Sequence, residues 1–260
     1  MSLATPSAGL EELVNETSGR EIVATSLLVD KYADLKKKYD YFFDDNNDME
    51  KWSKEYVQEI LLPCDINTFL QTTRYCEEHT DYSFTGFFIS QLIKNSYNAG
   101  NNDFKIDVND LRLVDFLAYE ISGTEEQKVR VAIKGRAWDW CGQYAQNCTF
   151  IIEKAGDECG QSAQYSTFTI GEAENWCGKY AKNSTFIIEK AGHECGSKAQ
   201  HSTFTIEKAG NWCGQDAQYS TFKTNNQQQY ERFKKSVNQN KGNKVYLLSD
   251  TGSIIKGGSW

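Results

Sequence analysis

The sequence predicts an α+β protein in which a mainly helical N-terminal domain precedes a single-stranded parallel β-solenoid of five 18-residue coils. Two observations lead to this prediction. Apolar residues recur with helical spacing through the first part of the chain, and from Ala137 to Phe222 the sequence repeats itself every 18 residues. We therefore expect a helical domain over residues 1–123, a solenoid domain over 124–224, and a cap of one helix and short strands over 225–260.

The first domain is expected to contain five helices and one short strand. Leu28, Tyr32 and Leu35 step by four and three residues, which is the spacing of one face of an amphipathic helix. These three residues belong to a helix expected over Arg20–Phe43. Pro63 must end the helix that begins near Asp48, because the residue before a proline is driven out of the helical conformation. The other expected helices are one after Asp65 with Ile66, Phe69, Leu70 and Thr73 on one face, Phe84–Gly100 and Asn109–Ser122, and the strand carries Phe104, Ile106 and Val108.

The repeat places identical residues at 18-residue intervals. Each coil has a Cys-Gly pair, a Phe preceded by Thr, and two alanines in most copies. Coils this short cannot hold the helix pairs of other solenoids, which need ~33 residues or more. Stacked coils pair their strands in parallel ~4.8 Å apart, so identical residues should form columns along the rod. The column residues are Cys141, Cys159, Cys177, Cys195 and Cys213, and Phe150, Phe168, Phe186, Phe204 and Phe222.

A two-coil period lies over the 18-residue period and separates the inside from the outside. Consecutive coils from Cys141 share 9 of 18 residues, whereas consecutive pairs of coils share 26 of 36. The residue before each cysteine alternates between Trp and Glu, and a buried column would not accept both. Strand alternation beside this exposed position predicts that Cys points inward. In the Thr-Phe-x-Ile strand it places Phe and Ile inside and Thr outside.

Both ends of such a rod need a cap, because an open strand edge pairs with other chains. The helical domain can cover the first coil, and a helix over Gln227–Gln239 with strands Lys244–Leu248 and Ser253–Lys256 can cover the last. The sequence Asp250-Thr251-Gly252 between these strands matches an aspartic protease motif. Its place between two apolar runs is typical of a hairpin turn instead.

The coil sequence resembles a repeat of known fold. The string Lys154-Ala155-Gly156-Asp157-Glu158-Cys159-Gly160, followed by Ala163 and Phe168-Thr169-Ile170, is similar to the glycine-rich repeat found in the C-terminal domain of the glutamate synthase large subunit and in a formylmethanofuran dehydrogenase subunit. The resemblance covers about 90 of the 260 residues and implies a right-handed β-helix. Because that module carries no catalytic residue in glutamate synthase, it also implies a structural role. The chain departs from the pattern where Ser166-Thr167 and its equivalents replace paired glycines.

Composition argues against two classes of partner. The net charge of -8 and the pI of about 5.1 give no general attraction to nucleic acid or to anionic membranes. No stretch approaches the ~20 apolar residues of a membrane span, and the first residues lack the basic and apolar segments of a secretion signal. We expect a cytoplasmic protein without nucleic-acid or membrane partners.

No metal, cofactor or catalytic site is predicted. A stacked cysteine column presents parallel thiols, whereas a tetrahedral metal site needs converging ligands, so buried thiols are expected. Asp44, Asn46, Asp48 and Glu55 have the spacing of an EF-hand loop, but Met49 stands where that loop needs glycine.

The candidate binding surface is an exposed aromatic row formed by Trp140, Trp176 and Trp212 and extended by Tyr144 and Tyr180. The tryptophans recur every second coil, so they should stand ~9.6 Å apart along one face. Contiguous exposed aromatic side chains mark contact surfaces, although the helical domain or the C-terminal segment could cover this row. The expected function is a non-catalytic repeat scaffold or protein-interaction protein, with a protein partner or self-association.

Two alternatives stay open. The first is a carbohydrate-acting enzyme or accessory subunit, with Glu153, Glu189 or His193 in a groove beside the tryptophans. Such an enzyme needs two carboxylates within ~10 Å of each other. The second is an ice-binding face formed by the outward threonine column. Two features argue against this alternative, namely the large helical domain and Lys223, which ends the adjacent row.

Overall fold

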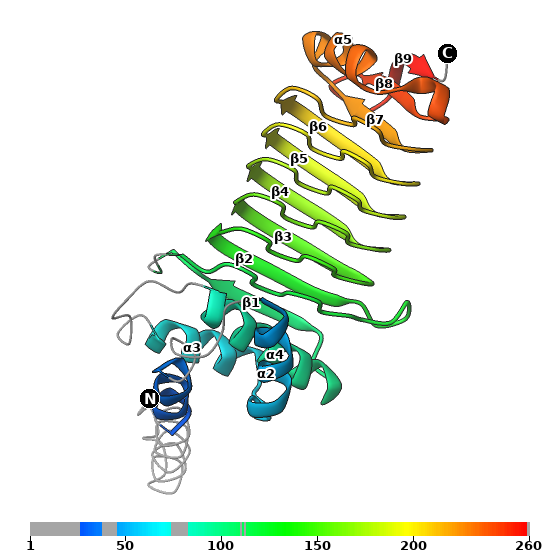
Figure 1. Ribbon diagram of the computed structural model, residues 1–260. Helices are drawn as coiled ribbons and strands as arrows, with labels where there is room; N and C mark the ends of the chain where they lie inside the picture. The colour runs from blue at the N-terminus through cyan, green and yellow to red at the C-terminus, as the bar shows by residue number, and fades with distance from the viewer. Residues whose placement is uncertain (1–26, 38–45, 74–82, 110, 112, 259–260) are drawn as a thin grey trace, which may run out of the picture.

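In the described part of the chain, nine strands form one sheet that runs the length of a rod, and helices pack at its N-terminal end (Figure 1). The computed structural model describes residues 27–37, 46–73, 83–109, 111 and 113–258. Each strand from β1 to β7 is parallel to the next, with the repeat in 18-residue register from β3 to β7, so the predicted fold class is confirmed. The strands are β1 (Asp103–Asp107), β2 (Val129–Ala137), β3 (Cys148–Ala155), β4 (Thr167–Ala173), β5 (Thr185–Ala191), β6 (Thr203–Ala209), β7 (Thr221–Thr224), β8 (Lys244–Leu248) and β9 (Ile254–Gly258).

The interior of the rod consists of the predicted columns. The five cysteines and five phenylalanines are at most 1% exposed, and the inward isoleucines are at most 2% exposed. The phenylalanine rings stack face to face, with neighbouring centroids 4.5 to 5.1 Å apart and planes within 8° of parallel. The threonine before each phenylalanine is only half-buried. The inward and outward assignments are therefore confirmed, and burial of each Phe or Ile stabilises the rod by roughly 1.5–3 kcal/mol.

The segment around each cysteine is a turn and not the strand that alternation suggests. In each repeat coil three residues other than glycine adopt the left-handed conformation, as Trp140, Tyr144 and Asn147 do at φ 58°, 58° and 50°. Such residues cost about 1–2 kcal/mol each. Hydrogen bonds between coils hold these turns, as where the Trp140 N–H donates to the Asp157 carbonyl at 2.9 Å. Glycine follows each cysteine because a Cβ on Gly160, for example, would lie 2.8 Å from the Phe186 ring.

Polar side chains link neighbouring coils in two ladders. In the buried serine ladder, the Ser166 N–H donates to the Ser184 hydroxyl and the Ser184 N–H donates to the Ser202 hydroxyl, both at 3.2 Å. A second ladder runs along a corner of the rod, where each side chain accepts a hydrogen bond from the backbone N–H 18 residues later. Its acceptors are Asp139, Asp157, Asn175 and His193. Both ladders satisfy backbone donors at the coil corners.

The prediction of a helix over Asn109–Ser122 is wrong, because this segment is part of a solenoid coil. Residues 115–120 form turns, and Ser122 bridges in parallel to Gln146. Phe116 and Glu120 are left-handed like Trp140 and Tyr144 in the next coil. Inward-facing residues of a short coil mimic the spacing of an amphipathic helix, which explains the error. The parallel sheet thus begins at Asp103, before the boundary expected after residue 123.

The other N-terminal helices agree with prediction within the described residues. Residues 27–37 are helical, while the ends of the helix predicted over Arg20–Phe43 lie outside the described residues, as do Asp44 and His79. The helix predicted from Asp48 begins at Asn46 and ends at Tyr56, so Ile60 follows it in a loop. These helices are α2 (Asn46–Tyr56), α3 (Pro63–Thr73) and α4 (Ser83–Asn98).

The two edges of the sheet end differently. At β1, the backbone of Asp107 bonds to α3, since its N–H donates to Asn67 Oδ1 at 2.8 Å and its carbonyl accepts from the Gln71 side chain. At the other end α5 (Gln227–Ser236) packs on the last coil, β8 continues the parallel sheet, and β9 returns antiparallel to β8. The predicted hairpin turn at Asp250 joins these last two strands. No helix among the described residues has both the length and the apolar character needed to cross a bilayer.

Candidate functional site

The predicted tryptophan row lies on the turn side of the coils. Trp140, Trp176 and Trp212 each occupy the first left-handed position of a turn, at φ 58°. Glu158 and Glu194 hold the same position in the intervening coils, at φ 58° and 54°. The alternation of Trp and Glu along the sequence therefore corresponds to a real column on the surface.

The row is covered at one end and open at the other. The Trp140 ring stacks on Phe116, with centroids 4.7 Å apart and planes 9° from parallel, and is partly buried. Trp176 is half-buried, while Trp212 is 59% exposed. The sequence leaves two outcomes open for the row, exposure or coverage by another part of the chain. Coverage is found for Trp140, and the covering segment is the coil that the sequence predicts to be a helix.

Basic side chains lie over Tyr180, one of the two tyrosines of the row. Tyr144 and Tyr180 are both exposed. The Lys179 ammonium lies 5.3 Å from the Trp176 ring centre and 5.6 Å from that of Tyr180. Lys198 Nζ donates to the Tyr180 hydroxyl at 3.1 Å, and this hydrogen bond raises the pKa of Lys198. Cations already occupy the ring faces near Tyr180, so this part of the row does not offer a bare aromatic surface.

The two described histidines and the column cysteines are part of the coil structure. His193 Nδ1 accepts a hydrogen bond from the Asn211 N–H at 3.1 Å as a member of the corner ladder, and His201 stacks on Tyr219 with centroids 5.1 Å apart. Hydrogen bonding to Cys159 and burial raise the pKa of Cys141 well above its ordinary value. Among the described residues, no three His, Cys, Asp or Glu side chains converge as a metal site would require.

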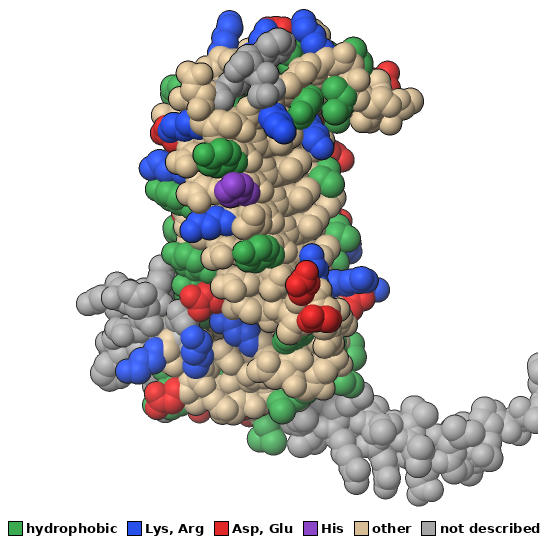
Figure 2. All heavy atoms as spheres, turned by 90° about the vertical axis from the view of Figure 1, so that its right-hand side faces the viewer, with side chains coloured by type: hydrophobic (Ala, Val, Ile, Leu, Met, Phe, Trp, Pro, Cys, Tyr) green, Lys and Arg blue, Asp and Glu red, His purple; other side chains and the backbone are tan. Residues whose placement is uncertain are grey.

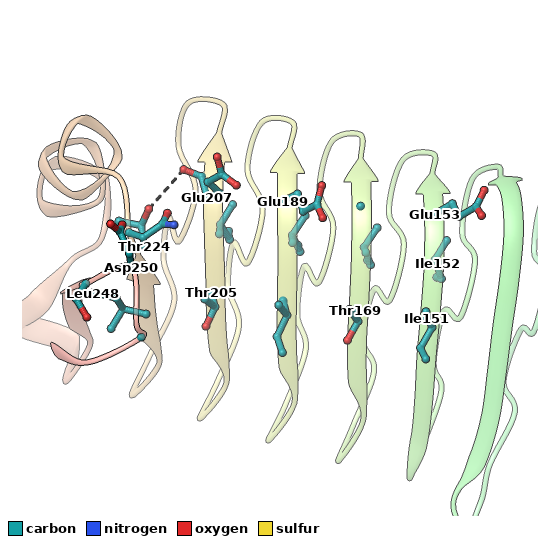
Figure 3. A pocket seen from close by; sticks show the side chains of 18 residues that line it. Ile151, Ile152, Glu153, Thr169, Glu189, Thr205, Glu207, Thr224, Leu248 and Asp250 are labelled. Atoms are coloured by element: carbon teal, nitrogen blue, oxygen red, sulfur yellow. Dashed lines mark hydrogen bonds between the residues drawn. The ribbon is translucent and has the colours of Figure 1, made fainter.

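A groove lies on the sheet face of the solenoid. Its floor consists of the outward residues Ile151, Thr169, Ile187 and Thr205, one from each of the strands β3 to β6. One wall is the next outward column, which carries Glu153, Gly171, Glu189 and Glu207. Leu248 at the end of β8 and Asp250 in the turn that follows it close one end (Figure 3). We call this concavity, of about 430 Å³, the Ile/Thr groove.

The Ile/Thr groove is apolar at its floor and acidic at its edge. Ile151 and Ile187 are 58% and 46% exposed. Four carboxylates line the groove, and no Lys, Arg or His among the described residues does. Glu153 accepts a hydrogen bond from the Gly135 N–H at 2.9 Å, and Glu207 lies 3.6 Å from Lys208. Glu189 and Asp250 also line the groove, and the described part of the chain shows no hydrogen bond or ion pair for either carboxylate.

The structure brings together only part of the predicted enzyme site. Glu153 and Glu189 line the same groove, but His193 and the tryptophans do not line it. The sequence shows the alternating Ile and Thr positions of the floor as an outward column. It also shows the Glu residues of the wall as a ladder of charged residues. The turn at Asp250 is also predicted, but nothing in the sequence shows that it folds over the end of these columns. The sequence therefore does not predict the groove.

Comparisons with known proteins give no match to this chain. No model of a protein family, no curated protein and no solved structure resembles it significantly.

Proposed function

We propose that the protein is a non-catalytic scaffold that holds an extended, positively charged segment of a partner protein in the Ile/Thr groove. The observation that carries this proposal is the composition of the groove, which combines an aliphatic floor with four carboxylates and no basic group among the described residues. Exposed aliphatic side chains favour an apolar ligand. A wall of one charge favours a ligand of the opposite charge and disfavours others.

The shape of the groove supports an extended ligand. Its floor spans three strand spacings, or ~14 Å, which matches about four residues of extended chain. The stacked phenylalanines beneath the floor make the surface rigid, and a preformed site loses less entropy on binding. The turn at Asp250 fixes where a bound segment must end. A cytoplasmic setting is part of the proposal, since all seven described cysteines are free thiols, as is usual in a reducing compartment.

Selection of peptides on the immobilised protein tests the proposal. Peptides selected from a random display library should be rich in Lys, Arg and aliphatic residues. Their binding should fall at least ~10-fold in the variant Glu189→Lys with Glu207→Lys, because a reversed wall repels the same ligand. The control variant Glu125→Lys with Glu126→Lys makes the same charge change in an exposed loop and should bind normally. Selected peptides that are acidic, or that bind both variants equally, would refute the proposal.

A carbohydrate-acting enzyme remains the second candidate because of one observation. Glu189 and Glu207 occupy equivalent positions on the paired strands β5 and β6, where the spacing of ~4.8 Å is close to the ~5 Å between the carboxylates of retaining glycosidases. Both project from the same wall, however, whereas catalysis requires carboxylates on opposite sides of the bond. Release of reducing sugar from a panel of polysaccharides, lost in Glu189→Gln and in Glu207→Gln, would favour the enzyme.

A further inference from the structure

The parts of the chain that precede and follow the solenoid have opposite net charges. Residues 1–123 contain 22 acidic and 11 basic side chains, residues 124–224 contain 12 and 11, and residues 225–260 contain 2 and 6. Their net charges are therefore -11, -1 and +4. The described residues before residue 124 contain 11 acidic and 7 basic side chains, a net charge of -4. Figure 2 shows basic side chains gathered around the C-terminal end of the molecule, whereas both signs are interspersed along the coils.

The N-terminal end presents an ordered apolar loop, which we call the head surface. The loop joins α2 to α3, and its side chains Ile60 and Leu62 are 66% and 57% exposed, next to the exposed Tyr56. The Asn95 side chain donates to the carbonyls of Val57 and Glu59 at 2.9 and 3.0 Å. These bonds hold the loop in one conformation, so its apolar side chains do not turn inward.

The C-terminal end presents an open strand edge, which we call the tail surface. It consists of Ile254 and Ile255 of β9, which are 59% and 63% exposed, and the neighbouring Lys256. β9 is the last strand of the sheet and pairs only with β8 among the described strands. The opposite edge at β1 differs, because α3 supplies side-chain partners for Asp107 there. Within the described sheet, only the tail leaves an edge strand without such partners.

We propose that copies of this chain associate head to tail, with the tail surface of one copy packed against the head surface of the next. Each surface exposes two or more large apolar side chains, and the parts of the chain that carry them have opposite charge. Tail-to-tail pairing through β9 would instead bring two ends of charge +4 together. The head and tail lie at opposite ends of the rod (Figure 1), so the contact is between different surfaces and builds an open chain of molecules. The Ile/Thr groove stays open in such a chain, and the two proposals stand or fall separately.

Sedimentation analysis of two blocked variants tests this association. Ile60→Asp with Leu62→Asp blocks the head, and Ile254→Asp with Ile255→Asp blocks the tail. The unmodified protein should show an average mass that rises at least ~2-fold between micromolar and near-millimolar concentration, the range of small interfaces. Each blocked variant alone should stay monomeric. An equimolar mixture of the two should form a dimer and nothing larger. The tail of the head-blocked variant can pack on the head of the tail-blocked variant, and both remaining surfaces of that dimer are blocked.

Three controls make each result decisive. Ile151→Asp with Ile187→Asp removes two similarly exposed isoleucines from the side of the rod and should leave assembly unchanged. Lys235→Glu with Lys244→Glu keeps the tail isoleucines and should weaken assembly, as should raised salt. Circular dichroism verifies that every variant is folded. A protein that stays monomeric at all concentrations, or a head-blocked variant that still forms dimers by itself, would overturn the proposal.

Discussion

The backbone N–H of Ser220 donates to Asn243 Oδ1 at 2.8 Å. In every earlier coil of the repeat the corresponding N–H donates to the serine hydroxyl of the next coil. The last coil has no successor with a serine, and Asn243 supplies the missing acceptor from the C-terminal cap. The same side chain donates to the carbonyls of Ala217 and Asn238, both at 2.7 Å. One buried amide therefore completes the serine ladder and connects the cap to it.

Asn243→Ala should destabilise the protein by about 2–3 kcal/mol, because a buried N–H and two carbonyls lose their partner. Urea unfolding followed by circular dichroism measures the change. Asn240→Ala, on an exposed residue of the same cap, should change the stability by less than about 0.5 kcal/mol. Equal effects of the two variants would show that Asn243 does not terminate the ladder.

Phe186→Ala should cost about 3–5 kcal/mol, because its stacked neighbours are held by their own strands and cannot fill the cavity. The next residue, Ile187, projects from the opposite side of β5 and is 46% exposed. Ile187→Ala should therefore cost less than about 1 kcal/mol. Thermal unfolding of the two variants compares the faces of a single strand. A loss under about 1 kcal/mol for Phe186→Ala would contradict its place in the ring stack.

The columns of the rod could be predicted from the sequence because repetition identifies equivalent positions without any knowledge of the backbone. The coil that contains Phe116 could not be predicted in this way. Its sequence does not match the 18-residue repeat, and its inward residues have the spacing of a helix. Without a second copy for comparison, periodicity alone could not distinguish a short coil from a helix.

The left-handed turns were beyond sequence reasoning for a related reason. Trp140 and Glu158 share one backbone conformation although neither residue type favours it. Hydrogen bonds between coils impose that conformation, and these exist only after the coils have stacked. The Ile/Thr groove likewise depends on where the turn at Asp250 lies relative to strands far away in sequence.

The tryptophan row should show graded contributions to stability. Trp140→Ala removes a ring that stacks on Phe116 and should cost about 2–4 kcal/mol. Trp212→Ala removes an exposed ring and should cost less than about 1 kcal/mol, with Trp176→Ala between them. Chemical denaturation of the three variants gives the order. A larger loss for Trp212→Ala than for Trp140→Ala would contradict the coverage of the row by the N-terminal part.

Thiol labelling should separate the cysteines by burial. Burial raises the pKa of Cys148 to about 12, and the thiolate is the reactive form. Cys64 is the one exposed cysteine among the seven described. In a Cys76→Ser variant, which removes the cysteine outside the described residues, we expect one thiol to react rapidly with a disulfide reagent and the other six only after unfolding. Rapid reaction of two or more thiols in the folded protein would contradict the closed interior.

His193 should be replaceable by asparagine but not by alanine. Asn175 has the equivalent role one coil earlier, where it accepts the His193 N–H at 2.9 Å. His193→Asn keeps an acceptor for the Asn211 N–H and should change stability by less than about 0.5 kcal/mol. His193→Ala removes the acceptor and should cost about 0.5–1.5 kcal/mol. Thermal melting of both variants checks the difference, and equal melting temperatures would argue against a ladder role.

Because each coil pairs only with its two neighbours, the number of coils sets the distance between the helical end and the C-terminal cap. One more copy of the two-coil unit would lengthen the rod by ~9.6 Å while each existing coil kept the same kind of neighbour. The length of the rod can therefore change in steps of one two-coil unit. Whatever binds at its two ends is held at a separation that evolution can adjust in fixed steps without redesigning either end.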